Sequence, residues 1–300
     1  MLRLSSYQLK EDVGGGINVL AMLKVEMREN MGETKYDISE ESKNVAENYY
    51  RYYRKFALSG IIGLHEGAVD RIMPKEGKTG PSLAFHIRLA QENYQEELQE
   101  LINGIRSGTV PDRWLITPDA EPENLADILK GNGFKNLSEN ASEPEPGMLL
   151  YAADFCPYPA DKPSVRCREV RTKEDFEIWV DVVNTALHGW RMIDAGHYAV
   201  WLAQKDMRFY LAETDGMPAA TAATIQSGST ASLEFISTLK EYRRRKAAIT
   251  LSSKALEDLF ADGVETVTLS GASEAVPLYK KLGFHECFHN IIMLYESGGI

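Results

Sequence analysis

The chain has 300 residues, of which 44% are hydrophobic and 26% charged, and its net charge is −11. This length predicts two domains, each large enough for its own hydrophobic core. The acidic balance argues against broad binding to nucleic acid or to an anionic membrane. The three cysteines stand at unrelated spacings, which indicates free thiols in a reducing compartment. No apolar run approaches the roughly 18 residues of a membrane helix, and the N-terminus lacks a signal-peptide layout. We therefore expect a cytoplasmic protein.

Residues 1–35 contain a run of three glycines at 14–16, and we interpret them as a flexible leader in which Met22 is a candidate start. Periodicity and turn residues then predict a first domain over residues 36–156. Its expected elements in chain order are a helix at Ser39–Phe56, strands at Gly60–Val69 and Ser82–Leu89, an amphipathic helix at Gln91–Ile105, a strand at Trp114–Thr117, a helix opened by Pro at Pro122–Lys130, a turn at Gly133-Phe134 and a strand at Met148–Leu150.

Three prolines between Cys156 and Ser164 mark the best position for a linker. The second domain then covers residues 164–300. Its expected elements are a strand at Val165–Val170, a helix at Lys173–Ala186 capped by Thr172, a helix at Ala195–Gln204, a hairpin of Arg208–Thr214 and Pro218–Gln226 turning at Asp215-Gly216, a strand at Leu233–Thr238, a helix after Ala248, a strand at Thr266–Leu269, a short helix carrying Tyr279, a Gly283-Phe284 turn and a strand at Ile291–Leu294.

The order of strand, helix, Gly-Phe turn and strand occurs in both halves, which indicates an internal duplication. The copies differ where chemistry would lie. Leu129 stands four residues before Gly133, whereas Tyr279 stands four residues before Gly283. No arginine-rich turn precedes the helix of the first copy. We therefore expect the first half to be structural and the second half to carry any site.

A strand that runs into a basic turn opening a helix is a device for holding phosphate. The free N–H groups at the helix start point outward, the helix dipole favours negative charge, and arginines add fork-shaped donors. The segment Arg243-Arg-Arg-Lys246-Ala-Ala248 has this character and is the densest basic run of the chain. The alternative is an ordinary solvated basic turn.

These motifs together resemble the core of the acetyl-coenzyme A-dependent GNAT N-acetyltransferase superfamily. The family's cofactor loop is Gln/Arg-x-x-Gly-x-Gly/Ala, and its later signature is a Tyr four residues before Gly-Phe, as in Tyr279-Lys-Lys-Leu-Gly283-Phe284. The resemblance covers roughly residues 163–296. It implies an α/β (α+β) fold of two tandem GNAT-like domains, each a mixed, mostly antiparallel twisted sheet flanked by helices. The first domain would be degenerate.

Two positions depart from the family pattern. Lys246 stands where the loop has its first Gly. If that position requires a positive φ, a Lys there costs about 1–2 kcal/mol, although a charged hydrogen bond to phosphate could recover about 1.5–3 kcal/mol. Ala272 replaces an Asn that many members carry seven residues before the Tyr.

Transfer of an acetyl group to an amine needs a base for the amine and an acid for the leaving thiolate. Tyr279 is the candidate acid, because a phenol with pKa near 10 is protonated at pH 7; the alternative is a tyrosine that packs on its own helix. Glu234 is the candidate base, because apolar neighbours such as Leu233 and Phe235 would raise its pKa. A water-mediated route and an ordinary solvated carboxylate are the alternatives, and many family members place the base at the position of Ser232.

The resemblance also implies which residues bind the two substrates. Main-chain groups of Ile236 and Thr238 would pair with the pantetheine arm. The pyrophosphate would be held by Arg243, Arg244, Arg245, Lys246, Ala247, Ala248 and Ile249. The acceptor pocket would be lined by His188, Trp190, Arg191 and Tyr198, in a region where His197 and Trp201 also lie. The alternative is that Trp190 and Trp201 belong to the core.

The string His285-Glu-Cys-Phe-His289 matches the zinc-protease motif H-E-x-x-H. That motif works on a helix, where the two histidines share a face. Here the flanking pattern predicts a strand, in which positions i and i+4 are about 13 Å apart and cannot hold one zinc ion. We therefore predict no metal.

These observations predict a cytoplasmic acyltransferase that moves the acetyl group of acetyl-coenzyme A to a primary amine of a small molecule or peptide. The amine would attack directly in a ternary complex, without a covalent enzyme intermediate. The alternative is a non-catalytic module that retains the fold and binds coenzyme A. We expect neither nucleic acid nor a membrane as a partner, and the family's common dimerisation leaves a homodimer open.

Overall fold

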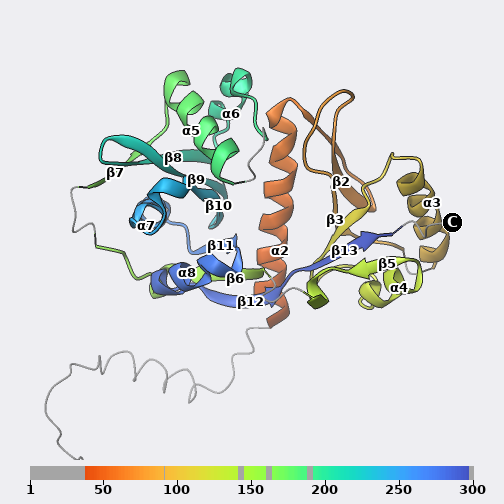
Figure 1. Ribbon diagram of the computed structural model, residues 1–300. Helices are drawn as coiled ribbons and strands as arrows, with labels where there is room; N and C mark the ends of the chain where they lie inside the picture. The colour runs from red at the N-terminus through yellow and green to blue at the C-terminus, as the bar shows by residue number, and fades with distance from the viewer. Residues whose placement is uncertain (1–37, 91, 141–144, 160–163, 188–191, 297–300) are drawn as a thin grey trace, which may run out of the picture. The chain divides into compact units, whose positions relative to one another are not determined.

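The computed structural model of the chain describes residues 38–90, 92–140, 145–159, 164–187 and 192–296 (Figure 1). The predicted leader at residues 1–35 lies outside this part, as do His188, Trp190 and Arg191. The helices are α2 (Ile38–Lys55), α3 (Tyr94–Arg106), α4 (Leu125–Gly131), α5 (Lys173–Ala186), α6 (Tyr198–Leu202), α7 (Ala247–Ala261) and α8 (Val276–Leu282). None of these helices is both long enough and apolar enough to cross a membrane.

The strands form two sheets. The first has the order β1-β2-β3-β4-β13-β5 and the second the order β12-β6-β11-β10-β9-β8-β7. Their bounds are β1 (Ile62–His65), β2 (Val69–Pro74), β3 (Leu83–Ile87), β4 (Arg113–Ile116), β5 (Phe134–Asn136), β6 (Pro146–Tyr151), β7 (Val165–Glu169), β8 (Met207–Thr214), β9 (Met217–Ser227), β10 (Thr230–Thr238), β11 (Thr266–Ser270), β12 (His285–His289) and β13 (Ile291–Tyr295).

Each sheet is antiparallel except for one parallel pair. The parallel pairs are β3–β4 in the first sheet and β10–β11 in the second. This confirms the predicted fold class of two mixed, mostly antiparallel sheets with flanking helices. The two parallel pairs occupy the same place in the duplicated unit. In each pair the second strand, β4 or β11, is followed by a short helix, α4 or α8, and then by the Gly-Phe turn.

The two halves exchange one strand each. β6 belongs to the first half of the sequence, but it pairs with β11 and β12 of the second sheet. β13 comes at the end of the chain, yet it pairs with β4 and β5 of the first sheet, as the blue strand in Figure 1 shows. The linear division into residues 36–156 and 164–300 therefore stays a proposal about the duplicated units, because each folded sheet contains a strand from the other half.

α2 is the element that the second sheet and the first sheet share. Val45, Ala46, Tyr49 and Tyr50 are spaced to form one apolar helical face, and all four are buried. They pack in one cluster with Phe85 of β3 and with side chains of α5 and β10. At the centre of this face, Asn48 Nδ2 donates to Thr268 Oγ1 at 2.9 Å and to the Ala231 carbonyl at 3.4 Å. The helix is thus anchored over the parallel pair β10–β11.

Several local predictions are confirmed and two are corrected. Thr172 caps α5 by accepting a hydrogen bond from the Asp175 N–H, and Asp215-Gly216 turns the β8–β9 hairpin with φ values of 53° and 80°. The expected single strand at Gly60–Val69 is instead the hairpin of β1 and β2, because the chain turns at Glu66-Gly67 and Gly67 N–H donates to Asp70 Oδ1.

The second correction concerns α4. This helix begins at Leu125 rather than at Pro122, so the proline precedes the helix instead of opening it. The apolar residues Leu125 and Leu129 still bury one face of α4, as the periodicity indicated. The start of α4 therefore differs from the prediction, but the apolar face of the helix still packs into the core.

Candidate active site

The parallel pair β10–β11 stops pairing part-way along β10. The last pair is Ser232 with Thr268. The register of β10 on its other neighbour, β9, shifts between Glu234 and Ser237, and Phe235 has a φ of 51° at this bulge. Bulges bend a strand and increase its twist. The described main-chain pairing therefore leaves the end of β10, including Ile236 and Thr238, without β11 as a neighbour.

Glu234 is placed at this point by β10. The residue is 8% exposed, and burial raises the pKa of its carboxyl to about 8, a shift that the Ser232 hydroxyl opposes. The apolar environment expected from the sequence therefore has the expected electrostatic effect. A carboxyl with a pKa near neutrality is suited to general-base chemistry.

Tyrosines surround the Glu234 carboxyl. The charge of Glu234 contributes to raising the pKa of Tyr49, Tyr52 and Tyr53 on α2, after burial as the largest cause. Sequence analysis predicted the helix that carries these tyrosines, at Ser39–Phe56, but did not connect them with the site. The signal was their spacing on one helix face, and only the packing of α2 over β10 showed its target.

Tyr279 lies on α8 and is 4% exposed. Burial, and then the charge of Glu234, raise the pKa of its hydroxyl above the usual value of 10. The phenol therefore stays protonated at neutral pH and can act only as a proton donor. The two predicted catalytic side chains are therefore both buried, and the charge of one raises the pKa of the other.

Gly271 makes room for the Tyr279 ring. A Cβ added at Gly271 would lie 2.7 Å from Tyr279 Cε2, a contact that neither group can accommodate without moving. The ring also packs edge-on against Phe284, with centroids 5.9 Å apart. Sequence reasoning missed Gly271, because a glycine after a strand signals only a turn.

The basic turn leads from β10 into α7. Arg243 Nε donates to the Thr238 carbonyl at 3.3 Å, and Arg245 pairs with Asp215 while its guanidinium lies 5.6 Å from the centre of the Tyr242 ring. The side chains of residues 243–246 are exposed. The turn is therefore a basic surface beside the start of a helix.

Main-chain donors converge at the start of α7. The first intrahelical bond is from the Thr250 N–H to the Lys246 carbonyl, and the helix has no side-chain cap. None of the described main-chain hydrogen bonds uses the N–H groups of Ala247–Ile249. Because such groups and the helix dipole favour an anion, this end of α7 can hold phosphate.

Lys246 has a φ of 71° and Arg244 a φ of 61°, so both adopt the left-handed conformation. The position that the family fills with Gly therefore does require a positive φ here. The left-handed conformation costs a side-chain-bearing residue about 1–2 kcal/mol. The Lys246 ammonium lies 5.5 Å from the centre of the Tyr158 ring, and that cation–π contact offsets part of the cost.

Of the predicted acceptor residues, only Tyr198 lies within the described residues. It is half-buried at the start of α6, and Lys173 Nζ lies 5.5 Å from the centre of its ring. Its described contacts do not include Glu234 or Tyr279. Trp201 is 0% exposed and belongs to the core, as the alternative interpretation held.

The H-E-x-x-H string lies on β12, which is a strand as predicted. His289 Nε2 lies 3.3 Å from Glu286 Oε2, whereas His285 Nε2 lies 3.3 Å from Glu41 Oε2 on α2. The two histidines therefore contact different carboxylates, and the arrangement is not that of a zinc protease.

Comparison with known proteins agrees with this geometry. A family model described as an acetyltransferase (GNAT) domain matches residues 170–293. A GCN5-related N-acetyltransferase from Kribbella flavida has a similar structure, with a TM-score of 0.62 and 17% identity over 86% of this chain and 96% of that chain. A search of curated protein sequences gives no match.

Two further solved structures have the same fold over most of their length. A tandem GNAT protein from the clavulanic acid biosynthesis pathway superposes with a TM-score of 0.57 and 13% identity, covering 80% of this chain and 85% of that chain. A GCN5-related N-acetyltransferase from Sphaerobacter thermophilus gives 0.54 and 13%, covering 84% and 90%. Residues 170–293 therefore match a GNAT acetyltransferase domain, within a fold that is similar to that of a tandem GNAT protein.

Proposed function

We propose that this protein transfers the acetyl group of acetyl-coenzyme A to a primary amine of a small molecule or peptide. The observation that carries the proposal is the position of Glu234 and Tyr279. Both are buried, the charge of Glu234 raises the pKa of Tyr279, and Glu234 lies where β11 stops pairing with β10, while the Tyr279 ring packs against Gly271 just after β11. A basic turn and a helix start follow directly on β10.

The cofactor supplies an activated acetyl group when it is bound. Main-chain groups of Ile236 and Thr238 would pair with its extended arm on the side where β11 does not pair with this part of β10, and there the Thr238 carbonyl also accepts a hydrogen bond from Arg243 Nε. The N–H groups of Ala247–Ile249 and the exposed side chains of Arg243 and Arg244 fit its pyrophosphate. The residues present thus offer the charge and the main-chain donors that the cofactor needs.

Glu234 is the proposed base. An alkyl amine with a pKa near 10 is only about one part in a thousand neutral at pH 7, so removal of its proton accelerates attack. A carboxyl with a pKa of about 8 holds the proton only moderately tightly and passes it to solvent between turnovers. Tyr279 is the proposed acid, which protonates the thiolate that leaves.

The acceptor is proposed only as a class, a primary amine on a small molecule or peptide. A cytoplasmic location and a homodimer stay predictions. The direct attack in a ternary complex follows from the pairing of one base with one acid, which leaves no step that needs a covalent enzyme intermediate.

Isothermal titration with acetyl-coenzyme A, followed by thiol release with a panel of amines, tests the proposal. We expect micromolar binding that is lost in the double variant Arg243→Ala, Arg244→Ala, and turnover that is lost in Tyr279→Phe. Cofactor binding without turnover on any amine would favour the non-catalytic module. Absence of binding in the unaltered protein would overturn both readings.

A further inference from the structure

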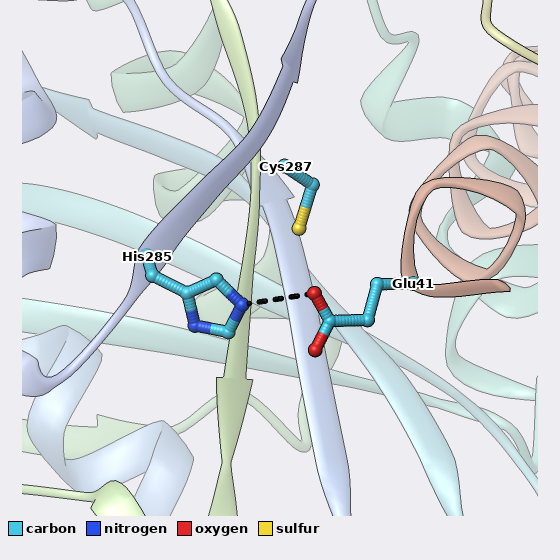
Figure 2. A group of neighbouring side chains, drawn as sticks. All are labelled: Glu41, His285 and Cys287. Carbon is cyan, nitrogen blue, oxygen red and sulfur yellow. Dashed lines mark hydrogen bonds and ion pairs between the residues drawn. The ribbon is translucent and has the colours of Figure 1, made fainter. Parts of the chain in front are cut away.

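Three potential metal ligands converge on one point outside the candidate active site. The ligand atoms of Glu41, His285 and Cys287 all lie within 4.8 Å of one another. Figure 2 shows the His285 ring and the Cys287 sulfur approaching from β12 and the Glu41 carboxylate from α2. Glu41 and His285 are 244 positions apart in the sequence. Such a mixed set of nitrogen, sulfur and oxygen donors is not an ordinary acidic surface cluster.

The backbone of β12 contributes to this convergence. The register of β12 on β6 shifts between Glu286 and Phe288, so a bulge occurs at Cys287. Residues 285 and 287 are two apart on this strand, so the period-2 alternation puts them on one face, and Cys287 Sγ and His285 Nε2 both approach the Glu41 carboxylate of α2. Glu41 is held opposite by the first turn of α2.

A neighbouring tyrosine orients two of the three groups. Glu41 uses Oε2 to contact His285 Nε2 at 3.3 Å, while its other oxygen, Oε1, accepts a hydrogen bond from Tyr151 Oη at 2.5 Å. The Tyr151 ring also stacks on the His285 ring, with centroids 6.0 Å apart and planes 19° apart. Hydrogen bonds that orient ligating carboxylates are a regular feature of metal sites.

We propose that Glu41, His285 and Cys287 form a binding site for zinc or a similar divalent transition-metal ion, which cross-links α2 to β12. Zinc takes nitrogen, sulfur and oxygen ligands at about 2.0–2.3 Å in tetrahedral geometry. Donors around one such ion lie roughly 3.2–3.8 Å apart, so the side chains need only a small approach. Three protein ligands leave one coordination position for water.

The charge at the site fits a cation, because the Glu41 carboxylate lies 3.3 Å from His285 Nε2 and shares the cluster with Cys287 Sγ. A bound metal ion takes the sulfur as thiolate, so binding releases the thiol proton to solvent and depends on pH. The His285 side chain is 43% exposed, which gives an ion access to the site.

Titration of the full-length, chelator-treated protein with cobalt(II) tests the proposal. We expect one equivalent to bind with a thiolate-to-cobalt charge-transfer absorption, and zinc to displace it. Cys287→Ser removes this absorption, and His285→Gln weakens binding about 10–100-fold or more. Cys167→Ser and His289→Gln serve as matched controls that leave the titration unchanged.

Absence of the charge-transfer absorption in the unaltered protein, or its survival in Cys287→Ser, would overturn the proposal. If Cys287→Ser fails to fold, Glu41→Gln preserves shape and still removes one ligand, and the unaltered protein should release about one thiol proton per zinc ion bound. None of these readouts depends on acetyl transfer, so the outcome is independent of the proposed function.

Discussion

The two parallel strand pairs, β3–β4 and β10–β11, start from the same geometry and end differently. Each first strand carries a non-glycine residue in the left-handed conformation, His86 with a φ of 50° and Phe235 with a φ of 51°. Beyond His86 the segments that follow β3 and β4 stay bonded to each other, because Leu89 N–H donates to the Glu121 carbonyl and Glu121 N–H donates to the Ile87 carbonyl. Beyond Phe235, the described residues show no corresponding bonds to the segment after β11.

Side chains continue this difference. In the first half, Arg88 pairs with Asp119, whose carboxylate also accepts a hydrogen bond from Tyr50 Oη at 2.7 Å. Burial disfavours the Asp119 anion, but the bonds from Tyr50 and Arg88 outweigh it and lower the pKa. In the second half, no cation contributes to the pKa of the Glu234 carboxyl, and burial raises that pKa to about 8.

The comparison teaches how a duplicated unit acquires or loses a site. Buried main-chain polar groups must find partners. The first half closes the end of its parallel pair with main-chain bonds, whereas the described part of the second half has no corresponding bonds and continues into a basic helix start. The two halves therefore share one topology but differ in the main-chain bonds beyond the parallel strand pair, as well as in Tyr279 and the basic turn, which only the proposed ligand-binding half carries.

The largest expected effect is on the chemistry of the second half. Glu234→Gln removes the proposed base at constant shape, and we expect kcat/KM to fall about 10²-fold or more with acetyl-coenzyme A affinity unchanged. In the unaltered enzyme kcat/KM should rise with pH up to about 8, as the carboxyl ionises. Glu265→Gln, at an exposed residue before β11, is the control. Equal rates in both variants would remove Glu234 from the mechanism.

Stability should respond to pH in the opposite direction. The folded pKa of Glu234, about 8, lies above its usual value of 4.5, so the folded state holds a proton that the unfolded chain has lost. The stabilisation is complete below the unfolded pKa and declines as pH rises towards 8, by up to about 1.4 kcal/mol per unit. Urea unfolding at several pH values should show this slope, and Glu234→Gln should lack it. A slope of the same size in the variant would assign the effect to another group.

Removal of the Arg88–Asp119 ion pair tests the structural role of the first half. Arg88→Met leaves the Asp119 carboxylate without its cation, and since Arg88 is partly exposed we expect the free energy of unfolding to fall by about 1–3 kcal/mol. Affinity for coenzyme A should not change. Arg171→Met, which removes an exposed pair with Glu169, should have no measurable effect on unfolding. Loss of cofactor binding in Arg88→Met would show that the first half also takes part in binding.

The smallest expected effect concerns the strained turn. Lys246→Gly removes the left-handed strain but adds freedom to the unfolded chain, so the net gain in unfolding free energy should be about 0.5–1 kcal/mol. Lys246→Ala removes the same side chain and keeps most of the strain. The difference in unfolding free energy between the two variants therefore measures the cost of the left-handed backbone conformation. Weaker acetyl-coenzyme A binding in both variants would show that the Lys246 ammonium contacts the cofactor. Equal stability of both variants would contradict the strain.

The sequence by itself determined the local elements of this protein. Periodicity and turn residues placed α2, α3 and α5, the basic turn after a strand placed α7, and Thr172 and Asp215-Gly216 marked a cap and a turn. The basic turn together with the spacing of Tyr279 to Gly283-Phe284 indicated the family resemblance. These signals depend on neighbours within a few residues, so they survive without tertiary context. The hairpin of β1–β2 and the start of α4 were missed because short turns compete closely with their alternatives.

Tertiary structure decided the rest. Strands β6 and β13 read correctly as strands, but only packing chose their partners in the opposite sheets, because period-2 alternation specifies a face and not a neighbour. The burial that raises the pKa of Glu234, the space that Gly271 leaves for Tyr279, and the meeting of Glu41 with His285 and Cys287 have the same origin. Each depends on groups far apart in the chain, whose distance no local pattern encodes.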